Sequence, residues 1–275
     1  MSNNSSRTLD GQHALITGGG SGIGLACARA LAHDGAVVTL MGRSRDKLEA
    51  AAETIDGART HAGDVSIEDD VAAAVSTAAE GGRLTICVAN AGTGGIAPLT
   101  ATSDAEWQRI LDTNLTGVFY TFKHAALAAA RVGGGAMCAI SSIAGIRTHR
   151  FMHAYCVAKS GVDMLVRTSA DELGAAGIRV NSVLPGLVDT EIAQGLFATE
   201  EVHQDYLACM PLSRTGEADD IAAAVRFLCG PESSWITGVN LSVDGGHHLR
   251  RGPNYDVFAR AGFADALKEA RLENE

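Results

Sequence analysis

HALITGGGSGIGLACARALAHDG, residues 13–35, is the stretch that decides the fold. Its first five residues predict a buried strand, and residues 22–34 place apolar side chains at helical spacing. The turn between them, TGGGSGIG at 17–24, is rich in glycine. Glycine lets the backbone approach a phosphate closely, and a helix N-terminus offers unpaired N–H groups and a positive dipole. Strand, glycine turn and helix in this order predict a dinucleotide site; a plain glycine-rich turn is the alternative.

The same alternation continues along most of the chain. Apolar runs predict further strands at 36–41, 59–64, 84–90, 136–141, 178–184 and 239–243, of which 59–64 is the weakest. Helical spacing recurs at 67–80, 104–131, 153–175 and 217–229. Parallel strands need a crossover connection, and these helices would supply it. We therefore predict a doubly wound α/β fold, a parallel sheet between two helix layers in the three-layer Rossmann arrangement.

Nothing in the sequence divides the chain into two domains. No internal repeat or low-complexity linker occurs, so we predict one domain over residues 8–246, after a flexible N-terminal tail at 1–7. Two regions interrupt the alternation: segment 187–213 is longer than an ordinary connection, and a C-terminal extension at 247–275 follows the last strand. Such folds place specificity in long insertions after strand ends, so we expect 187–213 to be a substrate loop.

Composition and charge exclude several classes of partner. The formal net charge of −10 argues against general binding of nucleic acid or anionic membrane, because both need clustered positive charge. A polar start and the lack of an apolar run of about 18 residues predict a soluble, cytoplasmic protein. The six cysteines are widely spaced inside apolar runs, which predicts buried, reduced thiols. The histidines have no matching ligand set, so we expect no metal site.

The end of the second predicted strand bears on the choice of nucleotide. Where a dinucleotide site usually has an acidic residue for the ribose 2′-hydroxyl, the sequence LMGRSRDK (40–47) has Gly42 and Arg43. A planar guanidinium can form two charge-assisted hydrogen bonds with a 2′-phosphate. We therefore favour NADP(H) over NAD(H), with Arg43 as the main contact and Ser44 or Arg45 as helpers. A solvated arginine at a strand end is the alternative.

Residues 153–161, HAYCVAKSG, pair a phenol with an amine. Tyr155 and Lys159 are four positions apart where a helix is predicted to begin, so they share one helix face about one turn apart. That spacing would place an ammonium beside a phenol. It is compatible with proton-transfer chemistry and also with an ordinary amphipathic helix.

These motifs together resemble the single-domain short-chain dehydrogenase/reductases. The resemblance covers roughly residues 8–246, and its motifs follow in order: TGGGSGIG (17–24), GDV (63–65), ANAG (89–92), DTNLTG (112–117), SSIAG (141–145), YCVAK (155–159), NSVLPGLVDT (181–190) and VDGG (243–246). The ordered set argues against chance. Two departures are Ala89, where many members have a second Asn, and the long extension after Gly246.

The resemblance implies a full set of cofactor contacts. The glycine turn would bind the pyrophosphate and adenosine ribose, Asp64 the adenine, and Lys159 the nicotinamide ribose. With the strand-end pair Arg43 and Ser44, the expected cofactor-binding residues are Gly18, Ser21, Gly22, Ile23, Gly24, Arg43, Ser44, Asp64, Val65, Asn90, Ala91, Gly92, Tyr155, Lys159, Pro185, Gly186, Val188 and Thr190.

The resemblance also implies an oxidoreductase that interconverts a secondary alcohol and a ketone. The implied catalytic residues are Asn114, Ser142, Tyr155 and Lys159. Tyr155 would transfer the proton while hydride moves between nicotinamide and substrate carbon. A free phenol has a pKa of about 10, and we expect the cation of Lys159 to lower it. Ser142 would hydrogen-bond the substrate oxygen, and Asn114 would complete a proton route through water to Lys159.

The expected substrate pocket is mostly apolar. Ser142, Ile143, Tyr155 and Leu187 would contact the substrate. Its apolar lining would be Ile96, Ile143, Ile146, Phe151, Met152, Leu187, Leu196 and Phe197. This favours a medium-sized hydrophobic alcohol or ketone. A 3-oxoacyl-thioester reductase of the same family is the alternative; a non-catalytic nucleotide-binding sensor is disfavoured because Tyr155 and Lys159 are both present.

Assembly can also be anticipated. The predicted helices 104–131 and 153–175 are rich in small apolar residues, and the resemblance suggests a homotetramer. We expect the extension 247–275 to cross a subunit interface and help close a partner's pocket. Arg147 and Arg150 would lie near the site entrance, where they could contact a carboxylate or phosphate or be ordinary surface charges.

Overall fold

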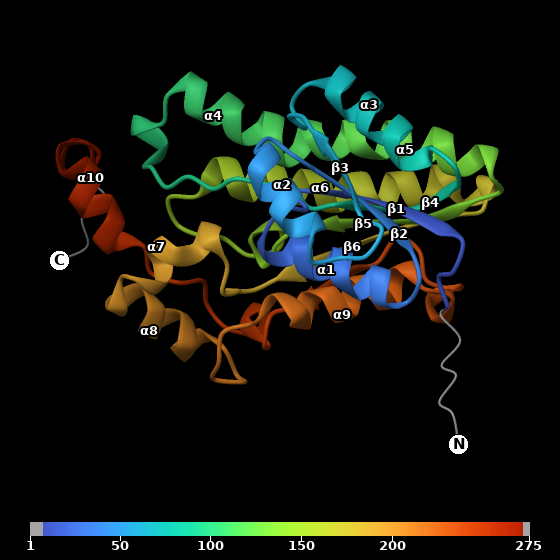
Figure 1. Ribbon diagram of the computed structural model, residues 1–275. Helices are drawn as coiled ribbons and strands as arrows, with labels where there is room; N and C mark the ends of the chain where they lie inside the picture. The colour runs from blue at the N-terminus through green and yellow to red at the C-terminus, as the bar shows by residue number, and fades with distance from the viewer. Residues whose placement is uncertain (1–7, 272–275) are drawn as a thin grey trace.

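The computed structural model describes residues 8–271 and contains a seven-stranded parallel sheet (Figure 1). The strand order is β3-β2-β1-β4-β5-β6-β7, and each neighbouring pair is parallel. The strands are β1 (Gln12–Thr17), β2 (Val37–Gly42), β3 (Arg59–Ala62), β4 (Arg83–Ala89), β5 (Gly135–Ile140), β6 (Ile178–Pro185) and β7 (Asn240–Val243). The predicted doubly wound α/β fold is confirmed. The predicted flexible tail, 1–7, lies outside the described residues.

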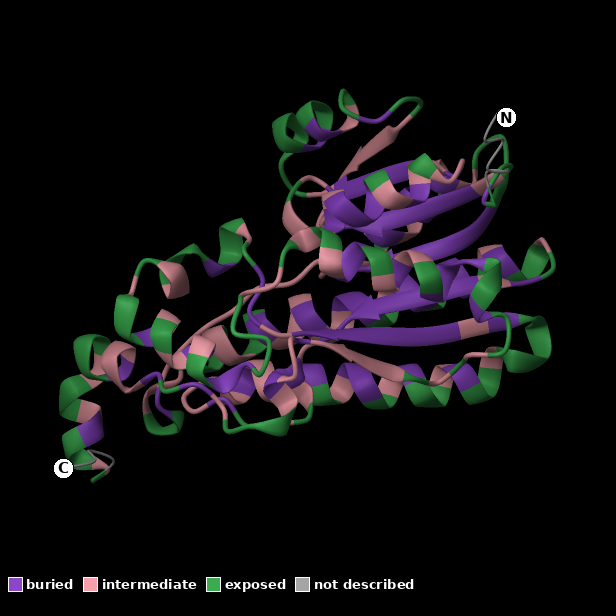
Figure 2. Cartoon of the chain, turned by 90° about the horizontal axis from the view of Figure 1, so that it is seen from below, coloured by how far each residue is buried: buried purple, intermediate pink, exposed green. Residues whose placement is uncertain are grey.

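Helices cover both faces of this sheet. On one face α1 (Gly22–His33) packs against α9 (Ala218–Cys229). On the other lie α3 (Glu68–Ala79), α5 (Gly117–Arg131) and α6 (His153–Leu173), with α5 between its two neighbours. The central strands are buried and the helices turn only one side inward (Figure 2). This is the pattern of a sheet whose apolar strands lose water on both faces.

The strand order reverses between β1 and β4. From β1 the chain continues to β2 and β3 on one side, and from β4 it continues to β5, β6 and β7 on the other. The loops that leave the carboxyl ends of β1 and β4 therefore diverge. In open α/β sheets this divergence creates the crevice in which ligands bind.

Two helical predictions need correction. The predicted helix 104–131 consists of α4 (Asp104–Leu111), a π-helical turn at Asp112–Thr116, and α5. Single π turns of this kind are frequent at functional sites, and this one contains Asn114. The helix α2 (Arg45–Ala52) was not predicted. It buries only Leu48 and Ala51, so its sequence has little apolar periodicity.

The two irregular regions fold together beyond the carboxyl ends of the strands. Segment 187–213 contains the short α7 (Gln194–Phe197) and α8 (Glu200–Cys209), and the extension contains α10 (Asp256–Glu269). These three helices lie together at the left of Figure 1. Their apolar side chains form one cluster built around Leu187, Val202, Tyr206, Met210 and Tyr255. This cluster is separate from the core around the sheet. It covers the crevice at the carboxyl ends of the strands, and we call it the roof cluster.

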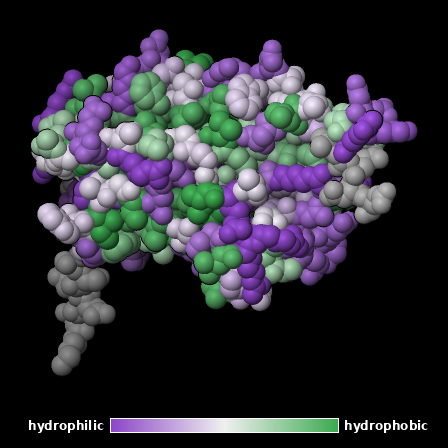
Figure 3. All heavy atoms as spheres, turned by 180° about the vertical axis from the view of Figure 1, so that it is seen from behind, coloured by the Kyte–Doolittle hydropathy of each residue, from purple (hydrophilic) through white to green (hydrophobic). Residues whose placement is uncertain are grey.

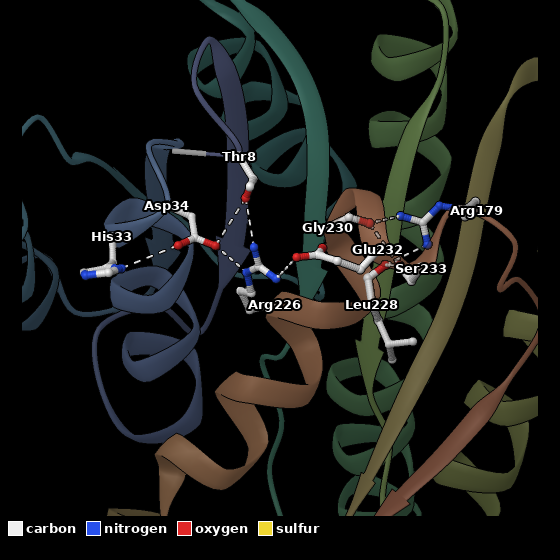
Figure 4. A network of polar contacts seen from close by, with 9 residues as sticks. All are labelled: Thr8, His33, Asp34, Arg179, Arg226, Leu228, Gly230, Glu232 and Ser233. Carbon is white, nitrogen blue, oxygen red and sulfur yellow. Dashed lines mark hydrogen bonds and ion pairs between the residues drawn. The ribbon is translucent and has the colours of Figure 1, made fainter. Parts of the chain in front are cut away.

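At the opposite end of the sheet, where the strands begin, charged side chains link neighbouring elements by ion pairs and hydrogen bonds (Figure 4). Arg226 of α9 forms ion pairs with Asp34, at the end of α1, and with Glu232. Arg179 of β6 donates hydrogen bonds to the carbonyl oxygens of Leu228 at 2.8 Å and Gly230 at 3.0 Å. These contacts lie far from the crevice, so we assign them to stability.

The cysteines lie mostly in the interior of the fold. All six cysteines are free, and five are buried as predicted; Cys156, on the face of α6, is only partly buried, so the prediction of burial is wrong for that residue. Within residues 8–271, no helix is both long and apolar enough to cross a membrane.

Candidate active site

One cavity of about 900 Å³ occupies the crevice. The following sequence-predicted site residues line it: Gly18, Ser21, Gly22, Ile23, Arg43, Ser44, Asp64, Val65, Asn90, Ala91, Gly92, Asn114, Ser142, Ile143, Tyr155, Lys159, Pro185, Gly186, Leu187, Val188 and Thr190. They come from the ends of six strands, β1 to β6, and from α1, α6 and the π turn. Gly24 does not line the cavity, and neither does Arg45, which was predicted as an alternative helper at the 2′-phosphate.

Hydrogen bonds from Asn90, at the end of β4, stabilise the glycine turn. Asn90 donates from Nδ2 to the carbonyl oxygens of Thr17 at 2.9 Å and Gly18 at 3.2 Å, and its backbone N–H donates to Thr17 Oγ1 at 3.0 Å. A Cβ on Gly24 would lie 2.3 Å from the Gly18 carbonyl oxygen and 2.5 Å from Asn90 Nδ2. Gly24 is therefore needed for packing inside the turn, and the side chain of Asn90 is engaged with the turn itself.

The start of α1 suits an anion. Gly18 and Gly22 have φ angles of +65° and +50°, which favour glycine and let the chain turn sharply into the helix. Neither a side-chain cap nor an acidic residue occupies the first turn of α1, so its N–H groups are free to bind a phosphate. The turn therefore fits the pyrophosphate of a dinucleotide.

The far end of the cavity, at β2 and β3, carries two cations. Arg43 is exposed and forms no ion pair with any residue in 8–271. Lys47 also lines the cavity and forms an ion pair with Glu191 at 2.6 Å, across from α2 to the chain after β6. Ser44 Oγ accepts a hydrogen bond from the Lys47 backbone and so caps α2. The sequence did not indicate Lys47, because α2 itself was not predicted.

Tyr155, Lys159 and Ser142 meet at the inner end of the cavity. Tyr155 hydrogen-bonds with Ser142, and Lys159 Nζ lies 5.5 Å from the centroid of the Tyr155 ring. Burial raises the pKa of Tyr155 above its ordinary value of 10, opposed by the Ser142 hydrogen bond. The expected lowering by Lys159 is therefore wrong for this structure, because the ammonium lies over the ring face and burial dominates.

Lys159 is buried and anchored. Its Nζ donates to the Ile140 carbonyl oxygen at 2.8 Å. Burial lowers the pKa of Lys159 from 10.5 to about 8, opposed by the charge of Asp163 one turn further along α6. Both Ser141 and Ser142 line the cavity, but Ser141 Oγ donates to the Lys159 carbonyl oxygen at 3.3 Å and is used within the fold.

We expect the lowered pKa of Lys159 to make the free energy of unfolding depend on pH. Between about pH 8 and pH 10.5 the unfolded chain holds this proton and the folded chain releases it, so this group makes the folded state more stable as pH rises. Lys159→Met removes the effect. Its free energy of unfolding relative to the unaltered protein should fall as pH rises from 8 to 10, by at most about 1.4 kcal/mol per pH unit. Urea unfolding at several pH values measures this difference.

The exposed Lys268 of α10 provides the control for that series. Lys268→Met should show no comparable trend between pH 8 and 10. A difference between Lys159→Met and the unaltered protein that stays flat over the same range would contradict the lowered pKa.

Asn114 is a positioning residue for the loop after β4. Its Oδ1 accepts from the Thr93 N–H at 3.1 Å, and its Nδ2 donates to the carbonyl oxygens of Thr93 at 2.8 Å and Ile110 at 2.9 Å. The side chain is fully buried, and both of its N–H donors are used within the fold. A water route from Asn114 to Lys159 stays a prediction.

The substrate half of the cavity differs in part from the predicted lining. Ile96, Ile143, Met152, Leu187 and Leu196 line it as expected. Ile146 is 54% exposed, and Phe151 and Phe197 pack in the roof cluster without reaching the cavity. Four residues outside the predicted apolar lining also reach the cavity: His149, Tyr206 of the predicted substrate loop, Tyr255 and Phe258. Three of these four lie in the irregular regions, where periodicity gives no signal.

The C-terminal extension closes the pocket of its own chain. Tyr255 and Phe258 line the cavity, and Asp256 forms an ion pair with Arg150. Arg147 donates to the His248 carbonyl oxygen. Neither arginine lines the cavity, so the expected role at the site entrance is not supported. A contact of the extension with a neighbouring subunit stays a prediction.

A family model described as enoyl-(acyl carrier protein) reductase, of the short-chain dehydrogenase type, matches residues 18–248. The chain belongs to the short-chain dehydrogenase/reductase family. It is therefore an oxidoreductase of the kind that uses NAD(H) or NADP(H) and acts on CH–OH groups.

Relatives of this short-chain dehydrogenase/reductase act on different alcohols. It is 36% identical to galactitol 2-dehydrogenase (L-tagatose-forming) from Cereibacter sphaeroides, over 87% of this chain and 96% of that protein. It is 39% identical to cis-4-hydroxycyclohexanecarboxylate dehydrogenase from Sinomonas cyclohexanicum, over 85% and 95%. A solved short-chain dehydrogenase/reductase from Mycobacterium ulcerans superimposes with a TM-score of 0.90 at 41% identity, covering 94% of this chain and 98% of that one.

Proposed function

We propose that this enzyme interconverts a medium-sized hydrophobic ketone and the corresponding secondary alcohol, with Tyr155 as the acid and base. The observation that carries the proposal is a single cavity. It joins the glycine turn, the hydrogen-bonded pair Ser142 and Tyr155, and a pocket wall built from Ile96, Ile143, Met152, Leu187 and Leu196. Phosphate binding, proton transfer and apolar substrate contact are thus contiguous.

The bound nicotinamide would supply the hydride in reduction and accept it in oxidation. As hydride reaches the carbonyl carbon, negative charge develops on the substrate oxygen, and the Tyr155 hydroxyl donates its proton there. Ser142 donates a hydrogen bond to the same oxygen and positions it. In alcohol oxidation the proton moves the opposite way, from the substrate hydroxyl to Tyr155.

Lys159 has two tasks in this proposal. Its lowered pKa of about 8 lets it exchange a proton close to neutral pH, so it can replace the proton that Tyr155 gives to the substrate in reduction and accept the proton that Tyr155 takes up in oxidation. It would also hydrogen-bond the nicotinamide ribose. The Ile140 carbonyl oxygen fixes the amine in place for both tasks.

The experiment that tests the function combines nucleotide binding with turnover. Fluorescence titration of the purified protein with NADPH and NADH comes first, followed by a panel of ketones and alcohols with the preferred nucleotide. Tight nucleotide binding with turnover of cyclic ketones supports the proposal. Binding without turnover of any ketone or alcohol would instead favour a nucleotide-binding sensor.

We propose NADP(H) as the preferred cofactor, because Arg43 and Lys47 place two cations at the adenosine end of the cavity. Arg43→Ala should raise the KM for NADPH by about tenfold or more, since a charge-assisted hydrogen bond contributes about 1.5–3 kcal/mol. The KM for NADH should change little. Steady-state kinetics with both nucleotides measure the two values.

Arg45 provides a matched control for that prediction. It belongs to α2, pairs with Glu49 at 3.9 Å and does not line the cavity, so Arg45→Ala should leave both KM values nearly unchanged. Equal effects of Arg43→Ala on NADPH and NADH would argue against a 2′-phosphate contact.

A 3-oxoacyl-thioester reductase is the second candidate. A relative named 3-oxoacyl-[acyl-carrier-protein] reductase, from Chlamydia muridarum, is 35% identical over 85% of this chain and 96% of that protein, which favours it. Turnover of a carrier-linked 3-oxoacyl thioester but not of free cyclic ketones would decide for this candidate.

We also propose a cytoplasmic homotetramer. Exposed hydrophobic side chains lie on α5 (Phe119 and Leu127) and on α6 (Val157 and Met164). On the face shown in Figure 3, hydrophobic residues form patches between charged ones. Packing of such helices against a second copy would remove this apolar surface from water. Light scattering measures the mass of the assembly.

A further inference from the structure

A cluster of four polar rings lies in the roof of the substrate pocket. His149 precedes α6, Tyr206 belongs to α8, His247 follows β7, and Tyr255 precedes α10. Their exposed fractions are 7%, 5%, 0% and 0%. Ring centroids are separated by 5.5 Å between Tyr206 and His247, 6.0 Å between the two tyrosines, and 6.3 Å between His149 and Tyr255. Four polar side chains therefore share one buried site.

The hydrogen bonds inside this polar ring cluster are incomplete. Tyr206 and Tyr255 hydrogen-bond to each other through their hydroxyls. A pair of hydroxyls that shares one hydrogen bond uses only one of its two hydrogens, so one donor remains. His149 Nδ1 lies 3.2 Å from the Arg147 carbonyl oxygen, so Nδ1 carries the hydrogen and Nε2 is left as an acceptor. Buried polar groups normally have partners, so the spare donor and acceptor point to a ligand.

The spare groups border the cavity that holds the catalytic residues. His149, Tyr206 and Tyr255 line it together with Tyr155 and Ser142. Both roof tyrosines are near enough to Tyr155 that its charge raises their pKa values further, after burial as the main cause. His247 lies behind them; within residues 8–271 neither of its ring nitrogens has a hydrogen-bond partner. The cluster is thus within the space available to one substrate.

The cluster offers hydrogen bonds without charge. Burial lowers the pKa of His149 to about 4 and lowers that of His247, so both imidazoles are neutral near pH 7. The nearby arginines do not line the cavity and are engaged elsewhere: Arg147 donates to the His248 carbonyl oxygen, Arg150 pairs with Asp256, and Arg251 pairs with Asp205. A carboxylate placed here would lose water without gaining a cation, which is costly. A neutral oxygen can accept the spare tyrosine hydrogen at no such cost, and a hydroxyl can in addition donate to His149 Nε2 and so complete both hydrogen bonds.

We propose that His149, Tyr206 and Tyr255 bind a second, uncharged oxygen of the substrate. The preferred substrate is then a ketone or secondary alcohol that also carries a hydroxyl or carbonyl oxygen away from the reacting carbon. This inference rests on the proposed function, because it concerns the far end of the same pocket. It narrows the substrate class from hydrophobic ketones in general to hydroxyketones, diketones and diols.

The test compares substrates that share one ring. The unaltered enzyme is assayed with NADPH and cyclohexanone, with 2-, 3- and 4-hydroxycyclohexanone, and with 4-oxocyclohexanecarboxylate. We expect kcat/KM for at least one hydroxyketone to exceed that for cyclohexanone by about tenfold or more, because the hydroxyl satisfies buried polar groups that cyclohexanone leaves unpaired. The carboxylate should be the poorest of the set.

The tyrosine hydroxyls are tested by removal. The quantity compared is the kcat/KM for the best hydroxyketone divided by the kcat/KM for cyclohexanone. Tyr206→Phe keeps the ring and should bring this ratio close to one. Tyr255→Phe serves as a second variant. Tyr120→Phe is the matched control, because Tyr120 lies on α5 outside the cavity, and it should keep the ratio of the unaltered enzyme. Circular dichroism and thermal melting check that each variant folds.

Two results overturn the inference: no preference for any hydroxyketone in the unaltered enzyme, or a preference that Tyr206→Phe and Tyr255→Phe both retain. If no ketone is turned over, the proposed function fails and recognition is measured by binding alone. Titration calorimetry then compares cyclohexane-1,4-diol with cyclohexanol on the protein with NADP⁺ bound. Diol binding about tenfold tighter, lost in Tyr206→Phe, supports the site; equal affinity removes it.

Discussion

Tyr155→Phe should lower kcat/KM for ketone reduction by about 10²–10⁴-fold, the range expected when a general acid is removed. The variant keeps the ring that packs beneath Lys159 and loses only the hydroxyl that hydrogen-bonds with Ser142. The developing charge on the substrate oxygen then lacks its proton donor. The loss should lie mainly in kcat, because the hydroxyl acts chiefly on the transition state.

Two measurements separate this effect from a general loss of structure. The dissociation constant for NADPH, from fluorescence titration, should change far less in Tyr155→Phe than turnover does. Tyr120→Phe, on α5 and outside the cavity, should keep nearly full activity. Retention of more than about a tenth of the activity in Tyr155→Phe would show that another group delivers the proton.

Gly24→Ala should abolish tight nucleotide binding. The new Cβ would lie 2.3 Å from the Gly18 carbonyl oxygen and 2.5 Å from Asn90 Nδ2, closer than any real contact, so the turn must move. Moving it breaks the hydrogen bonds from Asn90 to Thr17 and Gly18 and misplaces the phosphate-binding N–H groups. We expect the NADPH dissociation constant to rise more than tenfold and stability to fall by about 1–3 kcal/mol, as for an overpacked core.

Gly174 supplies the control for this substitution. It follows α6 with ordinary helical backbone angles, and a Cβ there would meet nothing within 4 Å. Gly174→Ala should therefore bind NADPH as the unaltered protein does. Unchanged NADPH affinity in Gly24→Ala would mean that the turn can adjust without loss, and that the proposed phosphate site is not built on this packing.

The glycine turn shows how far sequence reasoning reached at the cofactor end. Its place between a strand and a helix predicted a phosphate site, and the structure places Gly18, Ser21, Gly22 and Ile23 in the wall of the cavity. The prediction that Gly24 lines the cofactor site was wrong. A motif gives the residue type at a position but not whether that residue faces the cavity or the inside of the turn. Only the packing of Gly24 against Asn90, 66 positions later, revealed that direction.

The catalytic pair shows a different limit. The spacing of Tyr155 and Lys159 correctly placed both on one helix face, since helix geometry is local. The direction of the Tyr155 pKa shift was wrong, because burial depends on the loops and helices that cover the site. Asp163 lies four residues after Lys159, on the same face of α6. The same helical spacing could therefore have predicted that its charge acts on the pKa of Lys159.

The sequence by itself determined the strand and helix alternation, the sheet class and most of the residues that line the predicted cofactor half of the cavity, because these depend on local periodicity and on motifs at strand ends. Tertiary structure alone decided the substrate half. His149, Tyr206 and Tyr255 come from segments up to 106 positions apart, and they converge only because α8 and α10 pack over the carboxyl ends of the strands. Side-chain contacts between irregular segments leave no periodic trace in a sequence, so the chemistry of that pocket becomes visible only in the folded chain.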